Sequence, residues 1–235
     1  MAFAPPRIAP QPRPELDPTH YPVDDDMGEG VLHRLIVELL RPLVAEWLAK
    51  RGVTAFVGAS QFIYWVQYEP TASVAPDVYV LPSVEPSAVF GCWKVWETGI
   101  VPSFALEVVS RDVTKDYEIG PRRYEALGVR ELVVFDPEHH LSPERARWQL
   151  FRRRGRGPSA RLALAEATNR DRVRSPTLGC FLRSVGDGAR LRVRIATGAR
   201  GERLLPTPAE VAEAAKTANA RLRARLDARS SRRAR

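Results

Sequence analysis

Cysteine is nearly absent from this chain, which contains only Cys92 and Cys180 among 235 residues. The two are far apart, and neither belongs to a Cys-x-x-Cys pair. The sequence therefore excludes a disulfide-rich scaffold and a cysteine-based zinc site. We expect both cysteines to be small buried hydrophobic residues.

Long apolar runs and several common catalytic motifs are also missing. No stretch approaches 18 apolar residues, and residues 1–6 lack the charged and apolar parts of a secretion signal. We therefore expect a cytoplasmic protein with no membrane partner. The sequence has no P-loop, no dinucleotide fingerprint and no Gly-x-Ser-x-Gly elbow, so nucleotide-dependent and serine-hydrolase chemistries are not indicated.

Charge of either sign is present, but it is unevenly distributed. Residues 1–143 hold 12 basic and 20 acidic residues, a net charge of −8, whereas residues 144–203 hold 16 and 5, a net charge of +11. Residues 204–235 add a further +5. An acidic half suited to a metal is thus followed by a region suited to phosphate. An equally weighted alternative is a basic face that is merely solvated.

Local patterns predict one mixed α+β or α/β domain over residues 27–205. A proline-rich extended lead-in precedes it over residues 1–26, and a basic C-terminal helix and tail follow over residues 206–235. Apolar residues at helical spacing predict a helix over residues 32–48, kinked or broken at Pro42. Strands are expected over 61–68, 74–81, 104–109, 131–137, 148–151 and 191–195, a helix over 121–127, and a loop or short helix over 91–102.

Two carboxylates interrupt apolar strands of this prediction. Asp77 lies within the strand over residues 74–81, and Glu107 within the strand over residues 104–109. An uncompensated carboxylate is costly to bury, so such a residue is usually paired with a cation, bound to a metal or placed at a strand end. Oxygen ligands of this kind suit the hard divalent cations that assist phosphodiester hydrolysis. The residues alone leave the three explanations open.

Four strings in order resemble the Uma family of restriction endonucleases, which belongs to the PD-(D/E)XK nuclease superfamily. They are EGVLHR at 29–34, SVAPDV at 73–78, FALEVVSR at 104–111 and RRYEALGVRELVVFDP at 122–137. The segment 197–205 before the last helix also matches, and together the matches cover about half of the chain. The resemblance implies a restriction-endonuclease-like core, with a central mixed β-sheet flanked by helices. It also implies a metal-dependent endonuclease acting on nucleic acid, with DNA favoured over RNA.

The same resemblance assigns roles to acidic residues. Asp77 and Glu107 would be the catalytic carboxylates that hold Mg²⁺ or Mn²⁺, and Glu29 on the first helix would be an accessory metal ligand. Nucleases of this fold often form homodimers, although the sequence shows no interface signature. Arg122, Arg123 and the run at residues 152–154 (Arg152, Arg153 and Arg154) would face the phosphate backbone.

The signature lysine of this pattern is missing. Val109 stands at its usual place, and Gly120 stands at the position on the following helix to which the lysine is expected to migrate. Lys115 is the substitute that could orient or deprotonate the attacking water. Its alternative role is a surface ion pair with Asp112 or Asp116.

Two further functions therefore remain open. The chain could be a catalytically impaired nuclease-fold protein that serves as a nucleic-acid-binding or interaction module. It could also be an unrelated α+β enzyme if Asp77 and Glu107 lie far apart.

Aromatic and histidine residues are weaker candidates. Trp93 and Trp96 would stack on bases or, more commonly, pack within their loop. His139 and His140 fit a solvated turn better than a metal pair. His33, one helical turn from Glu29, would contact substrate or cap the helix face.

Overall fold

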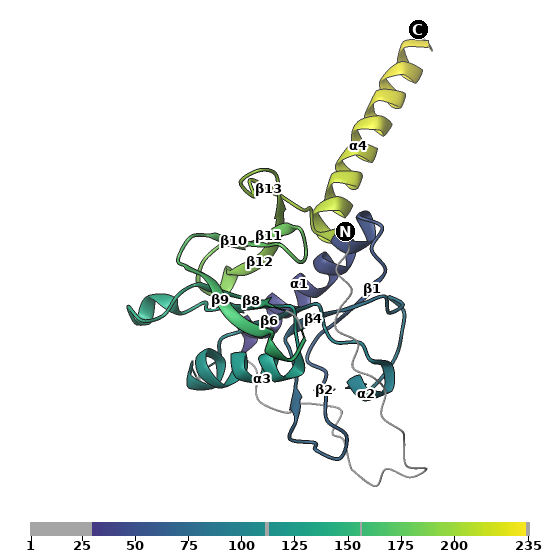
Figure 1. The fold of residues 1–235 in the computed structure, drawn as a ribbon. Coiled ribbons are helices and arrows are strands. Elements are labelled where there is room, and N and C mark those ends of the chain that lie inside the picture. Colours follow the sequence, from purple (N-terminus) through teal and green to yellow (C-terminus); the bar gives the residue numbers. More distant parts are fainter. Residues whose placement is uncertain (1–29, 111–112, 156, 234–235) are drawn as a thin grey trace.

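Three β-sheets form the framework of the protein in a computed structural model that describes residues 30–110, 113–155 and 157–233. The proline-rich lead-in over residues 1–26 and the side chain of Glu29 lie outside these ranges. No helix within them is both long enough and apolar enough to cross a membrane. The mixed α+β class with a central mixed sheet is confirmed (Figure 1).

The central sheet has six strands in the order β1-β4-β6-β7-β8-β9. β6 and β7 are parallel and are connected through α3, whereas the other neighbours pair antiparallel. The predicted βαβ crossover is thereby confirmed. The bounds are β1 Ala55–Gly58, β4 Val78–Pro82, β6 Phe104–Val108, α3 Gly120–Leu127, β7 Glu131–Phe135, β8 Trp148–Arg154 and β9 Arg161–Thr168.

Helix α1 (Val31–Lys50) packs between the central sheet and a second, four-stranded sheet. Leu40, Leu43 and Val44 are fully buried in a core cluster that contains residues of both sheets. The helix is continuous through Pro42, so the break into two helices, one of the two outcomes expected there, does not occur. A proline inside a helix costs about 3 kcal/mol. Burying the neighbouring leucines and valine contributes roughly 1.5–3 kcal/mol each, which outweighs that cost.

The second sheet follows the order β10-β11-β12-β13, and a small third sheet follows β3-β2-β5. Its strand β2 is much shorter than the strand expected over residues 61–68. Ser60 and Tyr68 adopt positive φ angles, which break the extended backbone on both sides. The remaining bounds are β2 Ile63–Tyr64, β3 Ser73–Val74, β5 Trp93–Lys94, α2 Val95–Thr98, β10 Arg172–Ser175, β11 Cys180–Val185, β12 Arg192–Thr197 and β13 Arg203–Leu204.

The C-terminal helix α4 (Pro208–Arg233) projects away from the sheets (Figure 1). Its first turn is anchored because the Thr207 hydroxyl accepts a hydrogen bond from the Glu210 amide, and Glu210 pairs with the buried Arg194 of β12. The described side chains beyond this base are exposed as far as residue 225. The predicted basic C-terminal helix is present as a solvated arm.

A buried carboxylate joins the central sheet to the second sheet. Glu131, at the start of β7, is fully buried and accepts hydrogen bonds from the hydroxyls of Ser175 and Thr177 and from the Thr177 amide. Burial raises the pKa of Glu131 above its ordinary value of 4.5, although these donors and Arg152 oppose the shift. The folded protein therefore holds this proton more tightly than the unfolded chain does.

Stability should consequently fall as pH rises through the window between 4.5 and the raised folded pKa of Glu131. The contribution is present in full below the unfolded pKa and is lost as pH passes the folded one. We expect Glu131→Gln to remove this slope, because the glutamine amide can still hydrogen-bond with these partners but does not titrate. Urea unfolding of both proteins from pH 4 to 8 measures it. Parallel curves for the two proteins would contradict the assignment.

Candidate active site

Asp77 and Glu107 occupy neighbouring positions on two adjacent strands. β4 pairs antiparallel with β6, with Val78 opposite Leu106, so the next step of the register sets Asp77 opposite Glu107. Asp77 lies just before β4 rather than inside a strand over residues 74–81, because Pro76 cannot donate to the ladder. The two carboxylates predicted from the sequence are therefore brought together, and the reading that required them to be far apart is excluded.

Asp77 is 5% exposed, and the described residues provide it with two hydrogen-bond partners. Its Oδ2 accepts the Val108 amide at 2.6 Å, and its Oδ1 lies 2.7 Å from Nε2 of His33 on α1. Each carboxylate oxygen has two lone pairs, so both retain acceptor capacity beyond these bonds. His33 thus contacts a site carboxylate, which sequence reasoning had left undecided between substrate contact and helix capping.

Glu107 is held from the opposite face of the sheet by α3. The hydroxyl of Tyr124, which is 1% exposed, donates a hydrogen bond to Oε1 of Glu107. Burial and then the neighbouring Glu107 raise the pKa of Tyr124 well above its ordinary value of 10. The phenol therefore stays protonated and remains a donor. Tyr124 is a site residue that the sequence analysis did not single out.

The two positions without the signature lysine flank this pair. Val109 is 7% exposed and packs in the core beneath α3, on the same side of β6 as Glu107. Gly120 is the first residue of α3, one turn before Tyr124, so it lies on the helix face that is directed toward Glu107. A side chain at position 120 would thus point toward the carboxylates.

A π-helix named η1 (Lys115–Ile119) joins β6 to α3 and was not expected from the sequence. Its Asp116 is 9% exposed, and Oδ2 accepts both the Ser110 amide at 2.6 Å and the Ser110 hydroxyl at 2.9 Å. Asp116 is therefore bonded to Ser110, which lies beyond the carboxyl end of β6 and three residues after Glu107. The backbone of Lys115 is its immediate neighbour.

The described residues contain no group of three or more His, Cys, Asp or Glu side chains arranged to hold a metal ion. Asp77 and Glu107 supply two carboxylates of the hard-oxygen type that Mg²⁺ and Mn²⁺ prefer. The third expected ligand, Glu29, is outside the described residues. The donor chemistry of these two carboxylates fits a divalent cation.

The arginines predicted to contact phosphate do not gather at this pair. Arg152 pairs with Glu131 in the β7–β8 register. Glu131 lies three residues before Val134, the partner of Glu107 on β7, so Arg152 is about 10 Å from Glu107 along the strands. Arg123 donates to the carbonyls of Thr71 and Ser73 at 2.5 and 2.6 Å. These side chains lie toward the other end of the sheet or bind backbone.

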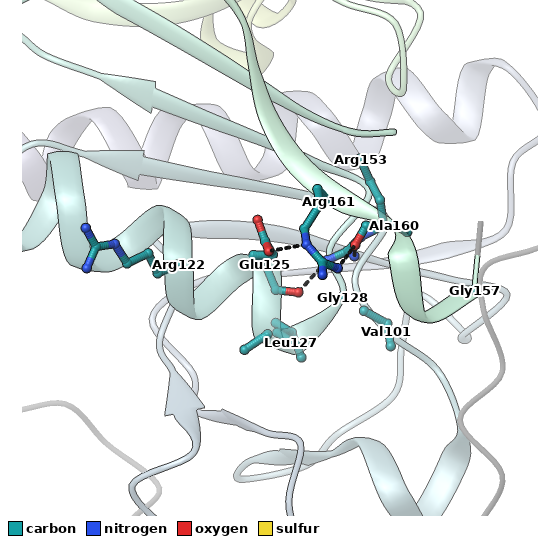
Figure 2. A pocket seen from close by; sticks show the side chains of 10 residues that line it. Val101, Arg122, Glu125, Leu127, Gly128, Arg153, Gly157, Ala160 and Arg161 are labelled. Atoms are coloured by element: carbon teal, nitrogen blue, oxygen red, sulfur yellow. Dashed lines mark hydrogen bonds and ion pairs between the residues drawn. The ribbon is translucent and has the colours of Figure 1, made fainter. Parts of the chain in front are cut away.

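A cavity of about 500 Å³ lies at that other end, beside the last turn of α3. Arg153 lines it and donates to the carbonyls of Val129, Ala160 and Glu125 (Figure 2). Figure 2 shows Arg122 pointing away from the guanidinium groups at the cavity. The cavity does not include Asp77 or Glu107.

The remaining aromatic candidates pack in the interior. Trp93 and Trp96 are 8% and 4% exposed, and the Trp93 indole donates to the Ile100 carbonyl. His139 lies beside the Asp136 carbonyl at 3.2 Å in a short turn. These contacts agree with loop packing and a turn.

Comparison with known proteins identifies a family. The Uma2 family model, described as "Putative restriction endonuclease", matches residues 25–180. The chain is also similar to a solved "putative nuclease belonging to DUF820" from Anabaena variabilis, with 14% identity, a TM-score of 0.43 and coverage of 65% of this chain and 76% of that one. No curated protein matches the chain.

Arg122 and Arg123 offer a matched test of which arginine serves the fold. We expect Arg123→Gln to lower the free energy of unfolding by about 1 kcal/mol, because two carbonyls lose their donor. Arg122→Gln should stay within about 0.5 kcal/mol of the parent, as exposed substitutions usually do. Urea denaturation measures both, and equal stabilities would show that the Arg123 contacts contribute nothing.

Proposed function

The chain belongs to the Uma2 restriction endonuclease family, and from this premise we propose that it is a divalent-metal-dependent endonuclease that hydrolyses phosphodiester bonds in DNA. The supporting observation is the register that sets Asp77 opposite Glu107. A pair of carboxylates at neighbouring strand ends, one of them almost fully buried, is suited to holding a hard cation beside a phosphate.

We assign a distinct role to each group. A bound Mg²⁺ or Mn²⁺ would polarise the phosphate and lower the pKa of a water. Asp77 and Glu107 would hold this ion, with Glu29 as the accessory ligand. His33 and the Val108 amide fix the Asp77 carboxylate, and Tyr124 fixes that of Glu107.

Lys115 is proposed as the residue that orients or deprotonates the attacking water. Its support is positional, since η1 begins at Lys115 and the next residue, Asp116, is bonded to Ser110 just beyond β6. Arg122 would contact a phosphate of the DNA. Arg152 and Arg154 would reach only DNA phosphates farther from the scissile bond. Arg123 and Arg153 are bound to carbonyl oxygens and would contribute least. Cleavage of both DNA strands would call for a homodimer, and we place the reaction in the cytoplasm.

A second function has its own observation. Gly120 and Val109 leave both lysine positions of the pattern without an amine. A nuclease-fold protein that binds nucleic acid without turnover would show affinity that falls steeply with salt and no cleavage under any metal.

The nuclease proposal predicts that isosteric removal of either carboxylate charge abolishes cleavage. We expect Asp77→Asn and Glu107→Gln to lower the plasmid-nicking rate in Mg²⁺ by about 100-fold or more, equivalent to about 2.7 kcal/mol of transition-state stabilisation. Glu85→Gln changes an exposed carboxylate beyond the opposite end of β4 from Asp77, and as the control it should nick like the parent. EDTA should stop nicking by the parent. Nicking by a folded Asp77→Asn protein at the parental rate would refute the metal site.

The role of Lys115 predicts a rescue. Lys115→Ala should lower nicking by about 100-fold, in the range of general-base catalysis. Adding Gly120→Lys should restore part of the rate, because residue 120 lies on the α3 face toward Glu107. Ile119→Lys, a neighbouring exposed position, is the control and should not restore it.

Three outcomes separate the assignments. Full nicking by Lys115→Ala would keep the nuclease and move the base elsewhere. Loss without rescue would assign Lys115 but reject the geometry at Gly120. DNA binding without nicking by any variant, with any metal, would favour the binding module.

A further inference from the structure

The connection between β6 and α3 depends on contacts outside its own backbone. η1 is a π-helix, a form that is rare and that occurs often at functional sites. It carries Asp116 and the backbone of Lys115 to the carboxyl end of β6. Whatever fixes η1 therefore fixes these residues relative to Glu107.

One fixed point is Asp116, which accepts the amide and hydroxyl of Ser110. The second is the next residue, Tyr117, which is directed elsewhere because successive helical side chains diverge. Its hydroxyl donates to Oδ2 of Asp136 at 2.6 Å and is also 3.1 Å from the Ala146 carbonyl. The Ala146 amide donates to the same hydroxyl at 3.2 Å. Tyr117 thus spans from η1 to the connection between β7 and β8.

Asp136 is a rigid partner for this hydroxyl. It is fully buried, and Arg145 donates to both of its oxygens at 2.6 Å. The Glu138 amide adds a bond of 2.8 Å to Oδ1. A buried, bidentate and fully bonded ion pair of this kind has a fixed geometry. Burial and the Asp136 bond raise the pKa of Tyr117 to about 12, so its hydroxyl keeps the proton it donates.

We propose that Tyr117 is a positioning residue whose bond to the Asp136–Arg145 pair holds η1, and with it Asp116 and Lys115, against the carboxyl end of β6. This inference rests on the proposed function for its consequence in catalysis. The Tyr117 ring also packs in the core under α3. Phenylalanine can fill the same space, so the hydroxyl can be removed without removing the packing.

Tyr117→Phe in the full-length protein is the test. We expect kcat for DNA nicking to fall about 10-fold with KM changed less than about 2-fold, as when a reacting group is misplaced. The backbone over residues 113–119 should exchange its amide hydrogens about 5-fold faster. Tyr79→Phe is the matched control, since this buried tyrosine also loses one side-chain bond, to Gln61, in the same core. It should change neither kcat nor exchange over residues 113–119.

The outcomes distinguish this inference from the proposed function. If the parent protein does not nick DNA, the proposed function fails, and faster exchange over residues 113–119 in Tyr117→Phe alone still supports the anchor. If the parent nicks and Tyr117→Phe matches it in kcat and exchange, the positioning role is overturned. Equal effects of Tyr117→Phe and Tyr79→Phe would also overturn it, because the effect would then be a general loss of core rigidity.

Discussion

The site depends on one hydrogen bond, between the Asp77 carboxylate and the Val108 amide. Continuing the β4–β6 register places Pro76 opposite Val108, but the Pro76 carbonyl accepts the Ser60 amide instead. The Asp77 side chain thus takes the place of the missing ladder acceptor. A single contact satisfies a buried amide, ends the pairing of the two strands and fixes a carboxylate opposite Glu107.

Three of the buried carboxylates in the described part of the chain, Asp77, Glu131 and Asp136, stand directly before, at the start of or directly after a strand, and each is stabilised in a different way. Asp136 is neutralised by the guanidinium of Arg145, and Glu131 is surrounded by hydroxyl and amide donors while its pKa is raised. The Asp77 carboxylate accepts a hydrogen bond from the Val108 amide and lies beside the His33 imidazole. Under the proposed function, a metal ion would add a further partner to the Asp77 carboxylate.

Much of the central sheet could be predicted because its signals are local. The apolar runs of β6 and β7 and the Gly128 stop of α3 each follow from a few neighbouring residues. β9 was missed because it is a largely exposed edge strand that holds mostly alanine and leucine rather than the β-branched or aromatic residues that would indicate a strand. The length of β2 was overestimated because aromatic residues that pack in a core resemble residues that form a ladder.

Of the residues at the candidate site, only the acidic ones could be predicted from the sequence. Asp77 and Glu107 stand out as charges among apolar residues, whereas Tyr124 and Tyr117 look like ordinary aromatic core residues in the sequence. Their function as donors depends on which carboxylate the fold sets against each hydroxyl. The π-helix has no local signature, since its extra residue per turn is stabilised by contacts to Ser110 and Asp136 that are distant or outside the helix.

Part of the positive charge in the basic region is used for contacts within the protein. Residues 144–203 carry a net +11, yet Arg145, Arg153, Arg183 and Arg194 are engaged with carboxylates or backbone carbonyls. A guanidinium that already donates to carbonyls must break those bonds before it can bind a phosphate. Part of the basic region therefore stabilises the second sheet and the last turn of α3.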